Sequence, residues 1–461
     1  MIIIAVALIL EFSLCNLIIN PNDDSEHPMA ALLLLGVNII IVCLAVLRSI
    51  KNEDHPEEEN SVKTMIISSF FIRIAIMFWD VYARHIFILP NSEGDAEWYH
   101  IKGVRYAFGF YSDKVDFGAY SYYVGRVYKM IGVQKVTIQF LHIFLAICSI
   151  LLIYKILLMF NVDTKIRRRA IAFACFLPNI MMITTFFLQE SVISFMIILS
   201  LYCYTKWWFG NKFVYLILSF VPSLLASVLH TGAIAVAVGI FSLVFVVSGK
   251  DHALKISPLR VLSIVVLIFV GILILSQFGD TFTGKLRGGL SAESIVYERD
   301  VRESGGSGYS AGISGLPPTL DLIVNTPIRM IYFVFSPLPW AWRGLADIIA
   351  FFGSTLFYIC TTYFSIKAIK RKPSRILKQD NISSYFLVLV VIILIAAIMF
   401  GWGVANAGSA LRHREKFTYL FIILFAISKE IIYRTETQNV SEYSFSDSAD
   451  IQRREISSQV R

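Results

Sequence analysis

The chain has 461 residues, of which 56% are hydrophobic and 16% are charged, and its formal net charge is +8. Soluble domains average about 45–50% apolar and about 25% charged residues, so this composition excludes a disordered chain, a collagen-like chain and a small disulfide scaffold. The mean hydropathy of +0.67 favours a membrane protein. In a soluble protein the basic balance would suggest nucleic acid, but here Lys and Arg gather in loops predicted to face the cytoplasm, so no nucleic-acid partner is expected.

Apolar runs of about 20 residues, the length that crosses a bilayer, recur as far as residue 433. They predict an all-α polytopic membrane protein with about twelve transmembrane helices. The predicted spans are 2–20, 29–48, 64–87, 136–158, 168–187, 189–206, 213–229, 231–248, 260–277, 345–367, 383–402 and 416–433. Residues 1–433 are expected to form one membrane domain, and the polar tail at 434–461 is expected to be cytoplasmic and disordered.

The charges of the loops predict how the chain is oriented. Residues 20–28 carry three acids and no Lys or Arg, which suits an external loop. Lys and Arg residues recur in four short loops, at 165–169, 206–212, 250–260 and 367–378. Because basic residues stay on the cytoplasmic side of the membrane, these loops and both termini are expected in the cytoplasm.

Two long segments, 88–135 and 278–344, are then expected outside the membrane. The first interleaves aromatic and charged residues, which suits amphipathic helices at the interface. The second is rich in glycine over 304–316, which favours a flexible lid, and continues into an apolar stretch at 333–340 broken by two prolines. We expect that stretch to be re-entrant or interfacial.

Three ionisable residues at external span ends are candidates for catalysis. Asp95 follows the third predicted span, Glu190 lies between two spans with no room for a loop, and His230 lies at a tight external turn. Each type can act as a general base or accept from a sugar hydroxyl. The structural alternatives are a solvated loop acid for Asp95, a helix N-terminal acid for Glu190 and a hydrogen-bonded core histidine for His230.

A basic turn before the last predicted span is the best candidate for binding phosphate. Arg412, His413 and Arg414 are expected on the external side, where the bias toward cytoplasmic Arg does not explain them. A guanidinium can bind two phosphate oxygens at once. Arg287 and Arg329 in the second long segment are weaker candidates for the same role. The structural alternative is contact with lipid head groups.

Aromatic residues near these charges suggest a sugar site, because aromatic faces pack on the CH groups of pyranose rings. Trp98 and Tyr99 follow Asp95 closely, and we expect them, together with Arg105 and Trp340, to contact substrate.

Cysteine usage and the missing motifs limit the chemistry. The six cysteines lie in apolar runs, and no Cys-x-x-Cys pair or Cys/His cluster occurs, so no metal site is predicted. The sequence also lacks phosphate-binding glycine loops and the motifs of soluble hydrolases. We therefore expect no cofactor, and we expect an activated donor to be carried by lipid.

The layout of these features resembles the polytopic polysaccharide polymerases of the Wzy type, which are similar to GT-C-class glycosyltransferases that use lipid-linked sugars. The resemblance covers most of residues 64–433 and lies in the acid-aromatic loop after an early span, Glu190, His230, the Pro-Trp segment at 337–340 and the basic turn.

The resemblance implies a metal-independent glycosyltransferase of the bacterial cytoplasmic membrane. It would join undecaprenyl-diphosphate-linked repeat units of a capsule or O-antigen at the outer face. The basic turn would stabilise the leaving diphosphate, while Asp95, Glu190 and His230 compete for the role of base. Implied partners are the lipid-linked glycan, the bilayer, and a chain-length regulator or flippase. The alternatives are a GT-C enzyme adding one sugar from a polyprenyl phosphate, a polysaccharide or lipid flippase, and a membrane O-acyltransferase.

Overall fold

The computed structural model describes residues 28–50, 56–110, 118–248, 253–254, 291–303, 308–309, 311–371 and 381–437. Nearly all of them are helical, and the strands β1 (Val247–Ser248) and β2 (Ala253–Leu254) form only a two-residue antiparallel pair. The predicted all-α class is confirmed within these ranges. The predicted spans at 2–20 and 260–277 and the tail beyond residue 437 lie outside the described residues.

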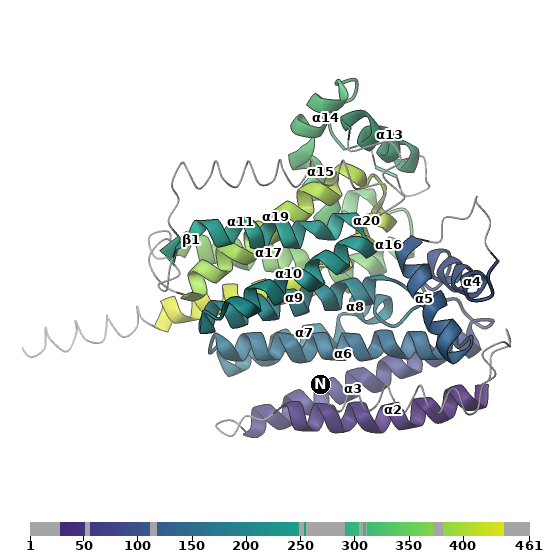
Figure 1. The fold of residues 1–461 in the computed structure, drawn as a ribbon. Helices are drawn as coiled ribbons and strands as arrows, with labels where there is room; N and C mark the ends of the chain where they lie inside the picture. The colour runs from purple at the N-terminus through teal and green to yellow at the C-terminus, as the bar shows by residue number, and fades with distance from the viewer. Residues whose placement is uncertain are drawn as a thin grey trace, which may run out of the picture.

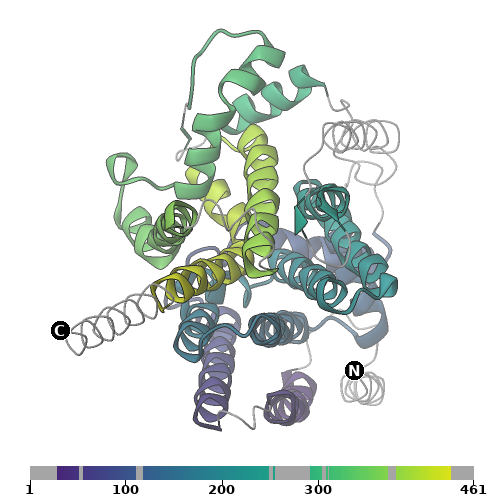
Figure 2. The same cartoon turned by 90° about the vertical axis from the view of Figure 1, so that its left-hand side faces the viewer.

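The long helices lie side by side in a bundle (Figure 1). They are α2 (Pro28–Ser49), α3 (Pro56–Phe78), α6 (Lys135–Met159), α9 (Glu190–Gly210), α10 (Phe213–Leu229), α11 (Ile234–Val246), α17 (Leu356–Arg371) and α19 (Asn381–Gly403). A further helix at 418–437 runs among them (Figure 2). Every residue from 414 to 428 is buried. A helix that is apolar on all faces needs protein around it, so this one forms the centre of the bundle.

Among the residues that the structure describes, five helical stretches are long and apolar enough to cross a membrane, so the chain is a membrane-embedded helical protein. They are Pro56–Ala83, Lys135–Met159, Glu190–Gly210, Leu345–Arg371 and Asn381–Gly403. Two of them pass through π-helical turns, η1 (Trp79–Ala83) after α3 and η4 (Phe351–Thr355) between α16 (Leu345–Ala350) and α17. Shorter apolar helices include Leu35–Ser49, Phe213–Leu229 and Thr231–Phe241. The predicted count of twelve spans is not confirmed.

The predicted span at 168–187 is wrong as a single helix. α7 (Thr164–Phe176) stops at Leu177, and α8 (Pro178–Ile183) is a separate short helix followed by an irregular stretch to residue 189. Pro178 has no backbone N–H and disfavours helical geometry at the residue before it, so α7 cannot continue through it. The break has a consequence for the candidate site, because it leaves Glu190 at the first position of α9.

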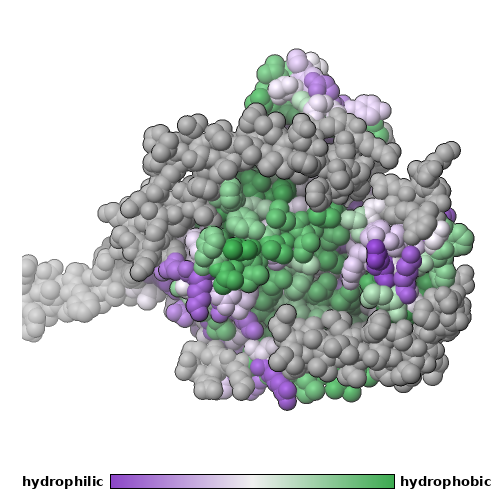
Figure 3. Space-filling view, viewed as in Figure 1, coloured by the Kyte–Doolittle hydropathy of each residue, from purple (hydrophilic) through white to green (hydrophobic). Residues whose placement is uncertain are grey.

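The lipid-facing surface is an apolar band between two polar ends (Figure 3). Eight apolar side chains of α10 are between 37% and 67% exposed, namely Phe213, Val214, Ile217, Leu218, Val221, Leu224, Leu225 and Val228. Large apolar patches are rare on soluble monomers, and this one runs along a whole helix.

The first long segment folds into α4 (Asp95–Ala107) and α5 (Gly118–Ile131), which pack closely at one end of the bundle (Figure 1). Gly103 and Gly125 allow this contact, because a Cβ atom at either position would collide with the other helix. Helices were expected in this segment, and the structure contains them. We call this end of the bundle the α4 end.

The second long segment also contains helices, α13 (Ala292–Glu303), α14 (Pro318–Val324) and α15 (Thr326–Phe335), followed by the short turn η3 (Pro339–Ala341). Another short turn, η2 (Thr231–Ala233), joins α10 to α11. The described part of the predicted lid is tied down. Tyr309 donates its backbone N–H to Ala405 at 2.9 Å, and the backbone N–H of Ile313 donates to Asn325 at 2.8 Å. These anchors argue against a lid at the described residues.

The two ends of the bundle hold different elements. α9 and α17 finish, and α7 begins, at the end that also holds β1 and residue 437, whereas α4, α5 and α20 (Ala407–Glu415) lie at the opposite end (Figure 1). The basic residues at 165–169 and 206–212 therefore lie away from the α4 end.

Candidate functional site

The basic turn predicted before the last span is the short helix α20. Asn406 caps its N-terminus, where the side-chain oxygen accepts from two backbone N–H groups at 2.9 and 3.3 Å. Successive residues of an α-helix point about 100° apart. Arg412, His413 and Arg414 therefore meet different neighbours.

Arg412 forms ion pairs with two carboxylates from distant parts of the chain. Its Nη1 pairs with Asp95 Oδ2, and its Nε lies 3.1 Å from Glu190 Oε1. The exposed fractions of the three side chains are 23% for Arg412, 48% for Asp95 and 0% for Glu190. Burial alone would lower the pKa of the Arg412 guanidinium, but the two carboxylates outweigh it and raise this pKa. Three of the predicted site residues thus lie together.

Lys416 completes this group, which we call the charge cluster (Asp95, Glu190, Arg412 and Lys416). Its Nζ lies 3.1 Å from Glu190 Oε1, and both side chains are fully buried. The same Nζ lies 2.8 Å from His413 Nδ1. Glu190 thus bridges two cations through one oxygen, while its second oxygen, Oε2, is buried without a hydrogen-bond partner among the described residues.

His230 lies beside this cluster rather than in it. Its ring centroid is 4.8 Å from that of His413 and 5.1 Å from that of Phe400, on which it stacks. His230 Nδ1 accepts from the backbone N–H of Gly232 at 3.3 Å, so the residue also caps the turn η2. His230 therefore lies near the other candidate residues, and it also makes a structural hydrogen bond.

The aromatic residues after Asp95 divide between the two faces of α4. Tyr99 is partly buried, and burial, followed by the nearby Glu190 carboxylate, raises the pKa of its phenol, while Arg412 opposes the shift. Trp98 is 55% exposed and Arg105 is also exposed. Tyr99 is therefore the only one of these three that is turned toward the charge cluster.

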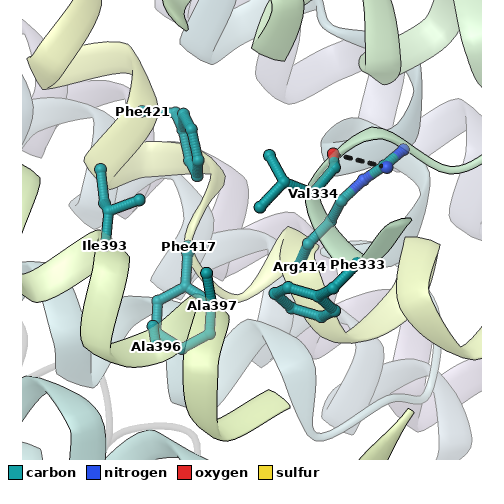
Figure 4. Close-up of a pocket in the computed structure, with 8 residues that line it drawn as sticks. All are labelled: Phe333, Val334, Ile393, Ala396, Ala397, Arg414, Phe417 and Phe421. Carbon is teal, nitrogen blue, oxygen red and sulfur yellow. Dashed lines mark hydrogen bonds between the residues drawn. The ribbon is translucent and has the colours of Figure 1, made fainter. Parts of the chain in front are cut away.

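Arg414 points away from the charge cluster and is buried between the end of α15 and η4. It donates to the carbonyls of Val334 and Ser336, and to the hydroxyls of Ser354 and Thr355 at 3.0 and 2.7 Å. The apolar cavity beside it is small, about 10 Å³, and is otherwise lined by aliphatic and aromatic side chains (Figure 4). These hydrogen bonds explain why Arg414 can be buried, because they join neighbouring parts of the fold. They do not support its predicted role in binding diphosphate.

Arg329 has a carboxylate partner of its own. Its two terminal nitrogens donate to the two oxygens of Asp321 at 2.7 Å each, and Arg299 donates to the same carboxylate at 2.6 Å. Burial would raise the pKa of Asp321, but the hydrogen bonds from Arg329 and Arg299 outweigh it, so this pKa lies well below its usual range. The predicted diphosphate role of Arg329 gains no support, because a buried bidentate pair already occupies its fork.

Two predicted binding residues remain, Trp340 and Arg287. Trp340 is 76% exposed in the turn η3. Arg287 lies outside the described residues. The role of each in binding stays a prediction.

Sequence analysis did not assign a role to Lys416, although the signal was present. It lies four residues after Arg412 in the same basic run, and residues four apart on a helix share a face. His142 was also missed, because it lies inside an apolar run. Its Nδ1 lies 2.8 Å from the carbonyl oxygen of Phe186, and its Nε2 lies 2.9 Å from the hydroxyl of Tyr120. The ring of Tyr120 in turn packs against that of Tyr99.

No protein-family model, curated protein or solved structure matches this chain. Within the described ranges no group of three His, Cys, Asp or Glu side chains is arranged to hold a metal ion. The chemistry of the site therefore has to be argued from its own side chains. The charge cluster offers a guanidinium for an anion and a half-exposed carboxylate for a proton, in direct contact with each other.

Proposed function

We propose that this chain is a membrane glycosyltransferase that polymerises undecaprenyl-diphosphate-linked repeat units at the outer face of the bacterial cytoplasmic membrane. The observation that carries the proposal is the contact between Arg412 and Asp95 at the α4 end. A cation for a leaving group and an acceptor for a proton are the two functions that such a transfer requires. With the α4 end outside, the basic loops and both termini face the cytoplasm.

The donor diphosphate is assigned to Arg412. Its side chain is 23% exposed, so part of the guanidinium is accessible, whereas the other nominated arginines, Arg329 and Arg414, are buried and occupied by protein. A planar guanidinium can hold two oxygens of a departing diphosphate. Lys416 sits behind it as a fixed positive charge that also favours developing negative charge.

The base is assigned to Asp95 among the three candidates. Glu190 is fully buried and paired with two cations, so it is poorly placed to meet a sugar hydroxyl. His230 uses Nδ1 to cap a turn. Asp95 is about half exposed, and the half-buried ring of Tyr99 on the same helix offers a surface for a sugar.

The reaction then balances without a cofactor. The acceptor hydroxyl gives its proton to the Asp95 carboxylate while its oxygen forms the new bond to the donor's anomeric carbon. The bond from that carbon to the diphosphate oxygen breaks, and the diphosphate leaves with the electron pair beside Arg412. Glu190 holds Arg412 and Lys416 in position and is a positioning residue in this scheme.

The test is polymer formation by purified full-length chain from undecaprenyl-diphosphate-linked repeat units. Arg412→Ala should lower the rate by about 10²–10³-fold, as loss of a group that stabilises developing charge typically does. Arg412→Lys should recover little, because a point charge does not reproduce the fork. Arg126→Ala is a matched control, because Arg126 lies on α5 at the same end and pairs with Tyr122 on its own helix.

Two results would contradict the proposal. One is a normal polymer ladder from Arg412→Ala. The other is no reaction of the purified protein with diphosphate-linked repeat units together with transfer of one sugar from a polyprenyl phosphate. That result would favour the single-sugar transferase.

A further inference from the structure

The charge cluster is electrically balanced as it stands. Arg412 and Lys416 contribute two positive charges, and Asp95 and Glu190 contribute two negative charges. Opposite charges in contact cancel most of each other's field. A diphosphate that bound both terminal nitrogens of Arg412 would meet an Nη1 group already paired with Asp95, so it would have to displace that carboxylate.

The two carboxylates differ in how easily they can be displaced. Glu190 is fully buried at the start of α9 and also holds Lys416, so its removal would strand a buried cation. Asp95 is 48% exposed at the first position of α4 and is free to turn toward water. Its pair with Arg412 is partly open to solvent, which weakens it relative to the buried pair of Glu190 and Lys416. Asp95 is therefore the partner that an incoming diphosphate would replace.

We propose that Arg412 exchanges Asp95 for the donor diphosphate, and that this exchange releases Asp95 to act as the base. The inference rests on the proposed function. Arg412 keeps Glu190 on its Nε side throughout and changes only the partner of its Nη1 group. Asp95 Oδ2 is then no longer held by Nη1 of Arg412 and can accept the proton of the acceptor hydroxyl. The protein thus withholds its base until the donor is bound, and the acceptor can react only after the donor.

The neighbouring residue Glu97 provides a matched control. It lies on the same turn of α4, two residues after Asp95, but it pairs with Arg84 and with Lys135, the latter at 2.9 Å. Its removal changes the charge of this turn by the same amount and leaves Arg412 untouched. Any effect of the local charge alone should appear equally in both variants.

The experiment measures the binding of undecaprenyl diphosphate to the full chain in lipid nanodiscs. Asp95→Asn should bind it roughly threefold to tenfold more tightly, since a competing ion pair of modest strength and a repelling charge are both lost. Glu97→Gln should bind it like the unchanged chain. Thermal unfolding of each variant shows whether the substitution disturbs folding. If Asp95→Asn does so, Asp95→Ser is measured in its place.

The outcomes separate this inference from the proposed function. Equal or weaker binding by both Asp95 variants, or equal tightening by Glu97→Gln, would overturn the exchange. Arg412→Ala decides the proposed function independently. If it binds undecaprenyl diphosphate as well as the unchanged chain does, then the diphosphate site itself is wrong, whatever the Asp95 variants show.

Discussion

The fully buried pair of Glu190 and Lys416 gives the sharpest test of how the charge cluster is held. Glu190→Gln removes the carboxylate that faces Lys416 Nζ at 3.1 Å, while Lys416 stays in a site with no exposure. Breaking a buried pair from one side typically destabilises a protein by about 3–5 kcal/mol. His413 Nδ1, at 2.8 Å from Nζ, remains as an acceptor. We therefore expect a loss of about 3 kcal/mol, at the lower end of that range.

The assay is SDS-titrated unfolding of the purified chain, followed by circular dichroism. The double variant Glu190→Gln, Lys416→Met removes both charges and should recover most of the loss. Glu430→Gln is the matched control. It also removes a buried acid, but its partner Arg434 is 36% exposed and can reach water, so the loss should be smaller. Unfolding of Glu190→Gln at the same SDS concentration as the unchanged chain would refute the buried pair.

Three further predictions concern other parts of the fold. Burial lowers the pKa of His100 to about 4, so the folded chain should lose stability as pH falls from about 6.5 to 4, where only the unfolded state takes up the proton; His100→Gln should flatten this dependence in thermal unfolding. Asp321→Asn should destabilise the chain by about 3 kcal/mol in the SDS titration, and adding Arg329→Met should recover part of it, whereas additive losses would contradict the pair. In intact cells an impermeant thiol reagent should label Glu93→Cys and not Lys212→Cys, and the reverse would invert the proposed orientation.

Much of the helical layout could be predicted from the sequence, because the length of an apolar run is a local property. α6, α10 and α19 begin and end within a few residues of their predicted bounds. The single helix predicted at 168–187 failed for an equally local reason, since Pro178 interrupts it. The prediction used the length of the apolar run and did not include the effect of Pro178 on the backbone.

Part of the predicted lid, residues 304–307 and 310, lies outside the described residues, and the rest makes contacts that the sequence does not reveal. Glycine at 312 and 315 indicates backbone freedom, but it does not reveal whether neighbouring residues use that freedom to form contacts. In the structure Asn325 binds the backbone of Ile313 on both sides, at 2.8 and 3.0 Å. Such contacts join residues from separate elements, so they become visible only once the chain is folded.

The sequence by itself indicated that Asp95, Glu190 and Arg412 would stand at the ends of apolar runs, because an unpaired charge buried in lipid is unfavourable. It did not determine which of them would meet. Arg412 and Arg414 are chemically identical and two residues apart, yet one joins Asp95 and Glu190 and the other ties backbone carbonyls near Ser336. The difference is the rotation of α20 about its axis. That rotation is set by packing against α8, α9 and α15, and only the tertiary structure decides it.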